Sequence, residues 1–527
     1  MLSLLLKRLV CLLCLLFLAS GCGIFKKPEP TIAPFISSTV VAVPIESDTL
    51  KYVECPFEGT DEIPPEQMAD IRCAKLTVPE DWQQPNGTKI QLAVAIVKTE
   101  SSDPKPDPVL VFLGNPGYGI FIAYALPYIF ESIFTQRDFI IVDQRGTGFS
   151  DPSIECQELS NLSGGSNTNL SPQEANDRLV EASRTCFDKV KAKGINLPNY
   201  TTTAEAADLE YLRQALGISK WNIYSFANGS RLALTMMRDY PQTIRSVVLD
   251  SPVPPQANPA AEWGTNAEKT LERFFNSCAG DELCAKFYPD LKTTFYALLD
   301  RLDAEPMVFT VSNQYSGERY QVTLDSDRLI TYLLLLFNTL NDRESLPQVP
   351  RMIYQLRDGK TEAAEHMMAR LPSDSLPGTG MELWIDCNEE LNFTTLEQVK
   401  QRNRNINSHL QEYFNAQAEG SFEACEDWKA PGVSDTENQP VASGIPALLL
   451  AGQFDWYEPP EWAELTAQTL KNSTTVEFRG VGQLVYASSQ WSVCSHQIVE
   501  AFLETPAVKP DTSCASAPFK ITWITLP

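Results

Sequence analysis

The stretch that decides the fold is Trp-Asn-Ile-Tyr-Ser-Phe-Ala-Asn-Gly-Ser-Arg, residues 221–231. Its apolar first part, residues 221–224, predicts a buried strand, and the residues from Ser230 onward predict a helix that begins directly after a tight turn. In such a strand–turn–helix unit the turn can expose a nucleophilic side chain above a sheet. The residue at the apex is Ala227, whose side chain has no acidic proton and no lone pair and therefore cannot attack a carbonyl.

Buried strands alternate with helices on both sides of this turn. Continuous apolar runs predict strands at 109–113, 139–142, 246–249 and 446–450, each buried on both faces. Residues 203–216 have helical spacing between two of these strands. This alternation predicts an α/β fold with a doubly wound, mostly parallel sheet.

A mainly helical segment, residues 258–440, interrupts the alternating pattern. It contains one expected hairpin at 308–322 and a leucine run at 326–340 that is too short for a membrane span, so we expect a buried helix there. We therefore predict a core in two parts, residues 47–257 and 441–527, with the helical segment inserted as a cap over the cleft.

The first residues have the pattern of a targeting segment. Lys7 and Arg8 precede a short apolar run, and Ala-Ser-Gly-Cys at 19–22 resembles a bacterial lipoprotein box, so residues 1–21 are expected to be a signal peptide. Lipidation of Cys22 would anchor the chain to a membrane surface, with residues 22–46 as a tether. The alternative is a plain secretory signal with an incidental cysteine. We expect a location in the bacterial cell envelope, lipid-anchored and facing outside the cytoplasm.

Ten cysteines follow Cys22, and an even number in an exported chain predicts disulfides. Nearest-neighbour pairing would join Cys55 to Cys73, Cys156 to Cys186, Cys278 to Cys284, Cys387 to Cys425, and Cys494 to Cys514. The net charge of −25 argues against a nucleic-acid partner. Three histidines and no Cys-x-x-Cys pattern outside the signal make a zinc site unexpected, and we predict neither a metal nor a cofactor.

The chain resembles the secreted tripeptidyl and prolyl aminopeptidase-type branch of the α/β-hydrolase family, over most of residues 50–515 and only loosely in the cap. The motifs that carry this resemblance are Val-Pro-Glu-Asp-Trp at 78–82, Gly-Asn-Pro-Gly at 114–117, Asp-Gln-Arg-Gly-Thr-Gly-Phe-Ser at 143–150, Gly-Ser-Arg-Leu-Ala at 229–233 and Val-Leu-Asp at 248–250, with Asp208 and Arg213. The spacing of the last two cysteine pairs is also similar to that of the family.

The resemblance implies where a catalytic triad would stand. The nucleophile falls on Ala227, the acid on Asp455, and the base on Gln483, where the family has histidine. At the oxyanion hole, Asn115 replaces the usual glycine, and Asn228 follows the nucleophile position. An amide takes up no proton near neutral pH, so only the acid of the triad remains. Loss of the nucleophile or the base alone lowers the kcat of a serine hydrolase about 10⁶-fold.

Other residues could in principle replace the lost groups. Ser225 and Ser230 flank the apex, but we expect both to hydrogen-bond backbone atoms at the turn and the helix start. His366 and His409 fall in the cap and His496 in the last helix, and we expect structural roles for all three.

Three functions follow from these observations. We favour a catalytically inactive pseudo-peptidase, exported and lipid-anchored, that binds a peptide, a small molecule or a protein partner at the cleft and cap. The alternative is an active exopeptidase or esterase-type serine hydrolase with a displaced nucleophile. A third possibility is a structural subunit of an envelope assembly, for which the cleft would be closed.

Overall fold

A computed structural model describes residues 45–46, 48–56, 71–112, 114, 119–162, 172–314, 317, 319–339, 345–370, 380–430, 434–488 and 491–525. The predicted signal peptide, Cys22 and nearly all of the tether lie outside these residues, and so does Asn115. Within the described part of the chain, no helix is long and apolar enough to cross a membrane.

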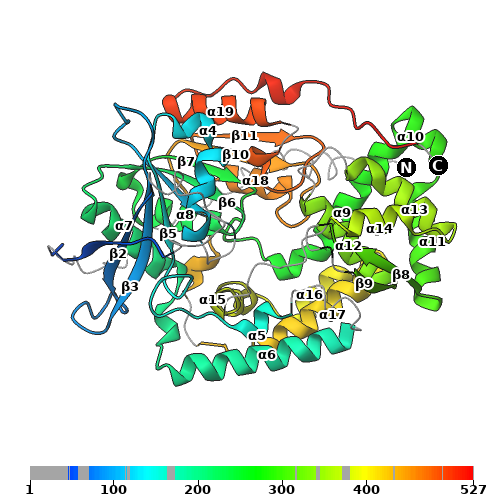
Figure 1. The fold of residues 1–527 in the computed structure, drawn as a ribbon, viewed down its shortest axis with the longest axis horizontal. Helices are drawn as coiled ribbons and strands as arrows, with labels where there is room; N and C mark the ends of the chain where they lie inside the picture. Colours follow the sequence, from blue (N-terminus) through cyan, green and yellow to red (C-terminus); the bar gives the residue numbers. More distant parts are fainter. Residues whose placement is uncertain are drawn as a thin grey trace, which may run out of the picture. The chain divides into compact units, whose positions relative to one another are not determined.

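The core of the protein is a nine-stranded sheet with the strand order β1-β2-β3-β5-β4-β6-β7-β10-β11. Figure 1 shows strands of this sheet together with helices that pack on it. Its strands are β1 (Leu50–Val53), β2 (Ile71–Pro79), β3 (Lys89–Val97), β4 (Val109–Phe112), β5 (Phe139–Asp143), β6 (Trp221–Phe226), β7 (Ile244–Asp250), β10 (Ala447–Gly452) and β11 (Ser473–Phe478). The pairs from β1 to β5 are antiparallel, and all pairs from β5 through β4 to β11 are parallel. The predicted mostly parallel sheet is confirmed.

Helices cover the sheet because its central strands are apolar on both faces. Every second residue of a strand points to the same side, and Tyr224, Val248 and Leu450 join one apolar cluster with residues of α4 (Glu131–Phe134) and α19 (Ser492–Glu504). Further core helices are α7 (Thr202–Ala215), α8 (Gly229–Asp239) and α18 (Pro460–Ala467), whereas α6 (Pro172–Ala192) packs against the helix Ser408–Ala424 of the inserted segment. Helix α8 packs on β6 and β7, and α18 packs on β10 and β11.

Between β7 and β10 the chain leaves the sheet and forms the inserted cap, which is mainly helical as predicted. Its helices are α9 (Pro259–Ala279), α10 (Glu282–Phe287), α11 (Leu291–Ala304), α12 (Ser326–Thr339), α13 (Val349–Arg357), α14 (Glu362–Met368), α15 (Gly380–Ile385), α16 (Leu396–Asn403) and α17 (Ser408–Ala424). A hairpin of β8 (Met307–Ser312) and β9 (Arg319–Leu324) stands where one was expected.

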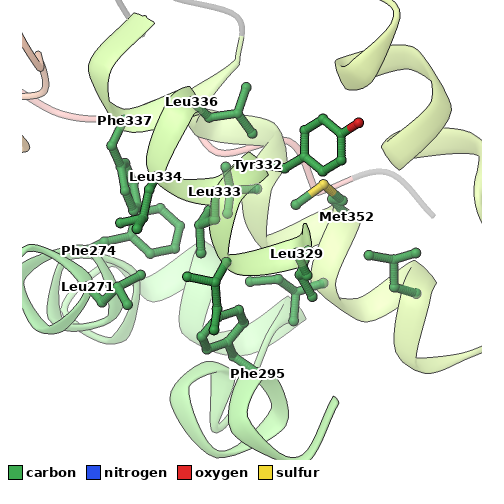
Figure 2. Close-up of a cluster of buried hydrophobic side chains, with 14 of the residues drawn as sticks. Leu271, Phe274, Phe295, Leu329, Tyr332, Leu333, Leu334, Leu336, Phe337 and Met352 are labelled. Carbon is green, nitrogen blue, oxygen red and sulfur yellow. The ribbon is translucent and has the colours of Figure 1, made fainter. Parts of the chain in front are cut away.

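The leucine run forms α12, which is a buried helix. Figure 2 shows side chains of α12 packed with Phe274 of α9 and Phe295 of α11. The same cluster includes Phe454 and Trp456, which belong to the second half of the core. The loop after β10 is therefore fixed by the interior of the cap.

All five predicted disulfides are present: Cys55–Cys73, Cys156–Cys186, Cys278–Cys284, Cys387–Cys425 and Cys494–Cys514. One group of possible metal ligands occurs among the described residues, Cys156, Glu158 and Cys186. Its two cysteines are bonded to each other, so neither offers a thiolate.

Candidate functional site

The turn after β6 has the geometry of a nucleophile elbow. Ala227 has a φ of 48°, in the left-handed region that non-glycine residues rarely adopt. Its backbone N–H donates to the carbonyl of Asp250 at the end of β7, with an N···O distance of 3.0 Å. A Cβ placed on Gly114, just after β4, would lie 3.4 Å from the Cβ of Ala227. The apex therefore sits at the carboxyl edge of the sheet, beside the turn expected to form an oxyanion hole.

Both serines beside the apex serve the turn itself. The Ser225 hydroxyl donates to the carbonyl of Val248, 3.3 Å away, and the side chain is fully buried. The Ser230 hydroxyl donates to the carbonyl of Ala227 at 2.6 Å and accepts from the N–H of Val253 at 2.7 Å. These bonds match the structural roles expected for both residues, and neither hydroxyl is free to act as a displaced nucleophile in this arrangement.

Asp455 follows β10 and is fully buried. Its Oδ1 accepts the backbone N–H groups of Tyr457 and Glu458, at 3.1 and 2.9 Å, and the side chain of Ser251 also acts on the carboxylate and favours its ionised form. Burial raises the pKa of Asp455 to about 7, against the opposing effect of those N–H donors, and the neighbouring Asp250 adds to the rise.

Gln483, at the position of the base, pairs with a different acid. Its side-chain amide donates to Oε2 of Glu458, which is 2% exposed. Burial raises the pKa of Glu458 well above its usual range, and the charge of Asp455 raises it further. Sequence analysis missed Glu458, although it stands only three residues after Asp455. The glutamine thus satisfies a buried carboxyl group instead of exchanging protons with a nucleophile.

Asp250 ties the base loop to the sheet. Its carboxylate accepts the N–H groups of Val485 and Tyr486 at 3.0 and 3.1 Å, and the hydroxyl of Tyr224 at 2.6 Å. Burial raises its pKa to about 6. Since the N–H of Ala227 donates to the carbonyl of Asp250, this one residue connects the apex with the loop that carries Gln483. The three triad positions are therefore brought to one edge of the sheet.

A small cavity of about 40 Å³ lies beside the apex. Its lining residues are Gly114, Gln144, Thr202, Glu205, Asn228, Gly229, Arg231, Leu232, Glu382, Ile385, Asp386 and Glu390. Four of them carry carboxyl groups and one, Arg231, carries a cationic group. A cavity of this size holds a few water-sized groups.

The carboxyl groups of this cavity crowd one another. Glu205 is 3% exposed, and its Oε1 has no hydrogen-bond partner among the described residues. Burial raises the pKa of Glu205 well above its usual range. It also raises the pKa of Glu382 to about 8, with a further contribution from Asp386, whose own pKa rises to about 6. None of these residues was singled out by the sequence, because they come from separate segments.

Arg231 is the counter-charge of the cavity. Its Nη1 lies 2.5 Å from Oε1 of Glu390, and its Nη2 donates to the carbonyl of Glu389 at 3.2 Å. Burial nevertheless raises the pKa of Glu390 to about 8, although Arg231 opposes the rise. One guanidinium does not offset the burial of these carboxyl groups, so Glu382 and Glu390, with pKa values of about 8, hold their protons near neutral pH.

The three histidines lie elsewhere. His366 is exposed on α14. His409 is bound by two aspartates, with Nε2 2.9 Å from Asp300 and Nδ1 3.3 Å from Asp303. His496 stacks on Tyr486, with ring centroids 4.1 Å apart. These contacts agree with the structural roles expected for His409 and His496.

Comparison with known proteins agrees with this geometry. A family model described as the alpha/beta hydrolase fold matches residues 107–489. Serine protease Hip1 of Mycobacterium bovis is 29% identical over 242 residues, which is 41% of this chain and 41% of that protein. Tripeptidyl aminopeptidase of Streptomyces lividans is 28% identical over 198 residues, 35% of this chain and 36% of that protein.

Putative hydrolase YuaR of Escherichia coli is 23% identical over 524 residues, covering 93% of this chain and 98% of that protein. The matches to Hip1 and to the tripeptidyl aminopeptidase, in contrast, span less than half the length of those two proteins. Because the model of the alpha/beta hydrolase fold covers more than half of the chain, the chain belongs to the α/β-hydrolase fold family, and it has peptidase-type relatives.

Proposed function

We propose that the protein is an exported, lipid-anchored pseudo-peptidase that binds the ammonium group of a ligand, such as the amino end of a peptide, and does not hydrolyse it. The observation that carries this proposal is the acid-lined cavity beside Ala227. The residue at the apex supplies no nucleophile, while the wall next to it offers four carboxyl groups to a cation.

The size and charge of the cavity favour a small cationic group. About 40 Å³ accommodates an ammonium group with one or two waters, but not a peptide side chain of ordinary size. Glu205 brings a buried carboxyl oxygen without a hydrogen-bond partner in the described structure. A bound cation would supply that oxygen with a donor and lower the energy of ionising its neighbours.

The chemistry of hydrolysis lacks two of its three groups. Ala227 cannot form an acyl-enzyme, and Gln483 is bonded to Glu458. In a serine hydrolase without its triad, substrate binding and the oxyanion donors alone accelerate hydrolysis by roughly 10³- to 10⁴-fold over the rate in water. The peptidase names belong to the relatives. For this chain they support the proposal that the ligand is a peptide, bound by its amino end.

Export and anchoring rest on separate features. Five disulfides indicate an oxidising compartment outside the cytoplasm. Attachment to the membrane depends on Cys22, and mass spectrometry of the protein purified from a bacterial host would detect diacylation there. An unmodified protein that begins elsewhere than Cys22 would contradict the anchor.

Calorimetric titration with methylammonium tests the cation site, since this ion stays charged up to about pH 9. We expect one site whose affinity rises from pH 6 to pH 8, because the carboxyl groups of Glu382 and Glu390, with pKa values of about 8, must release protons. Glu205→Gln should weaken binding at least tenfold, whereas Glu423→Gln, an exposed acid of α17, should not. Equal affinity in all three proteins would contradict the proposal.

Labelling with a fluorophosphonate serine probe tests the loss of chemistry. We expect no labelling of the natural protein and labelling of the double variant Ala227→Ser/Gln483→His at the serine introduced at the apex. Labelling of the natural protein at any serine would show an active hydrolase with a displaced nucleophile. Absence of labelling in both proteins would show that the cleft is closed to the probe and would favour a structural subunit of an envelope assembly.

A further inference from the structure

A second cavity, of about 520 Å³, lies between α6, α12 and α17. It shares no lining residue with the cavity at the elbow. Its volume falls within the range of about 300 to 1,000 Å³ that is typical of sites for small organic ligands. Neither the triad positions nor the acidic cavity uses it.

One part of this cavity is apolar. Leu179 of α6, Leu335 and Tyr332 of α12 and Ala416 of α17 line it. Figure 2 shows Tyr332 pointing away from Phe274 and Phe295, so α12 buries one face in the cap core and offers another to the cavity. Leu335 is 43% exposed, so its side chain is accessible from the cavity.

The other part of the cavity carries negative charge. The carboxylate of Asp327, in the first turn of α12, lines it. Burial raises the pKa of Asp327 to about 6, and three acids that face it add to the rise: Asp325, Asp303 and Glu412. An anion placed here would be repelled, whereas a cation would relieve the crowding.

The cations near Asp327 are already engaged. Arg328 donates to Asp325 at 2.6 Å and to the carbonyl of Thr323 at 2.6 Å. His409, the other basic group that acts on Asp327, is held by Asp300 and by Asp303. No cationic side chain is therefore ion-paired with Asp327 within the described structure.

Two aromatic rings complete the polar end. Tyr413 lines the cavity from α17, and its hydroxyl lies 3.0 Å from that of Thr331, which fixes the side chain. Tyr332 lines it from α12. Aromatic faces attract organic cations, and most strongly where water is partly excluded.

We propose that the cavity between α6, α12 and α17 binds an amphipathic organic cation. The charged head lies at Asp327 between the tyrosines, and the apolar body lies along Leu179 and Leu335. The proposal does not depend on the cation site at the elbow, because the two cavities share no residue.

Titration calorimetry with octylbenzyldimethylammonium, below its micelle concentration, tests this site. Its charge is independent of pH, and N-benzyloctanamide serves as an uncharged compound of similar size. We expect one molecule of the cation to bind, and the amide to bind at least tenfold more weakly. Asp327→Asn should reduce the affinity for the cation to that for the amide, while Glu362→Gln, an exposed acid of α14, should leave it unchanged.

A second variant locates the apolar body. Ala416→Trp places a large side chain in the cavity and should abolish binding of both compounds, with thermal unfolding measured to establish that the variant folds. The proposal is overturned if the cation and the amide bind equally well, if Asp327→Asn does not change the affinity, or if binding persists in a folded Ala416→Trp protein. Binding of many molecules per chain would indicate adsorption to apolar surface and would also overturn it.

Discussion

The buried carboxyl groups of the cavity beside the apex predict how the free energy of unfolding depends on pH. The variant Glu390→Gln isolates the contribution of one of these groups. Glu390 is 7% exposed, and its pKa rises from 4.5 to about 8 because of burial. A rise of this size corresponds to about 5 kcal/mol of unfavourable ionisation in the folded state. Glutamine keeps the shape and the carbonyl oxygen of the protonated acid but cannot ionise.

The sign of the effect follows from proton binding. Between pH 4.5 and 8 the folded protein holds a proton on Glu390 that the unfolded chain has released, so its stability falls as pH rises, by about 1.4 kcal/mol per pH unit for this group. The variant lacks this contribution. We expect the two proteins to have similar stabilities near pH 5 and the variant to be the more stable one at pH 8, by at most about 5 kcal/mol.

Urea unfolding followed by tryptophan fluorescence at pH 5, 6, 7 and 8 measures the difference. Glu423→Gln, with the same chemical change at an exposed position of α17, is the matched control and should follow the natural protein. Parallel curves for Glu390→Gln and the natural protein would refute the reasoning. A uniform loss of about 3–5 kcal/mol would show instead that Glu390 is ionised throughout and that its ion pair with Arg231 dominates.

Two further predictions concern the scaffold. Asp208→Ala leaves the fully buried guanidinium of Arg145 without its bidentate partner, and should lower the free energy of unfolding by about 3–5 kcal/mol in urea titrations. A loss below about 1 kcal/mol would contradict this. Replacing both Cys387 and Cys425 by serine opens a loop with a sequence separation of 38 residues and should cost about 4 kcal/mol, measured in the same way. An unchanged midpoint would show that the disulfide does not constrain the unfolded chain.

The elements that the sequence predicts well have a continuous local pattern. β4, β6, β7 and β10 are central strands, and their uninterrupted apolar runs follow from burial on both faces. The edge strand β1 was missed because it has only four residues, and the last three are exposed. Helix α6 was missed because it is largely polar, and its packing against α17 joins two distant segments (Figure 1).

In the site, too, some residues are predicted by the sequence and others are not. Ala227, Asp455 and Gln483 follow from short motifs that stand at strand ends, and parallel strands bring those ends to one edge. The hydrogen bond from Gln483 to Glu458 and the approach of Glu205 to Glu390 depend on how loops and the cap fold over the sheet. Local periodicity contains no information on such contacts, so the acidic cavity could not be predicted.

The strained backbone at the apex of the elbow is kept although Ala227 has no nucleophile. A left-handed conformation costs a non-glycine residue about 1–2 kcal/mol, and Ala227 still adopts it although it has no nucleophile to present. The neighbours enforce it: the N–H of Ala227 donates to Asp250, and its carbonyl accepts from the hydroxyl and the N–H of Ser230. Ser230 also accepts from the N–H of Val253 and so joins the helix to the segment that follows β7. The strain is thus held by bonds that stabilise the core, and its presence alone is no sign of catalysis.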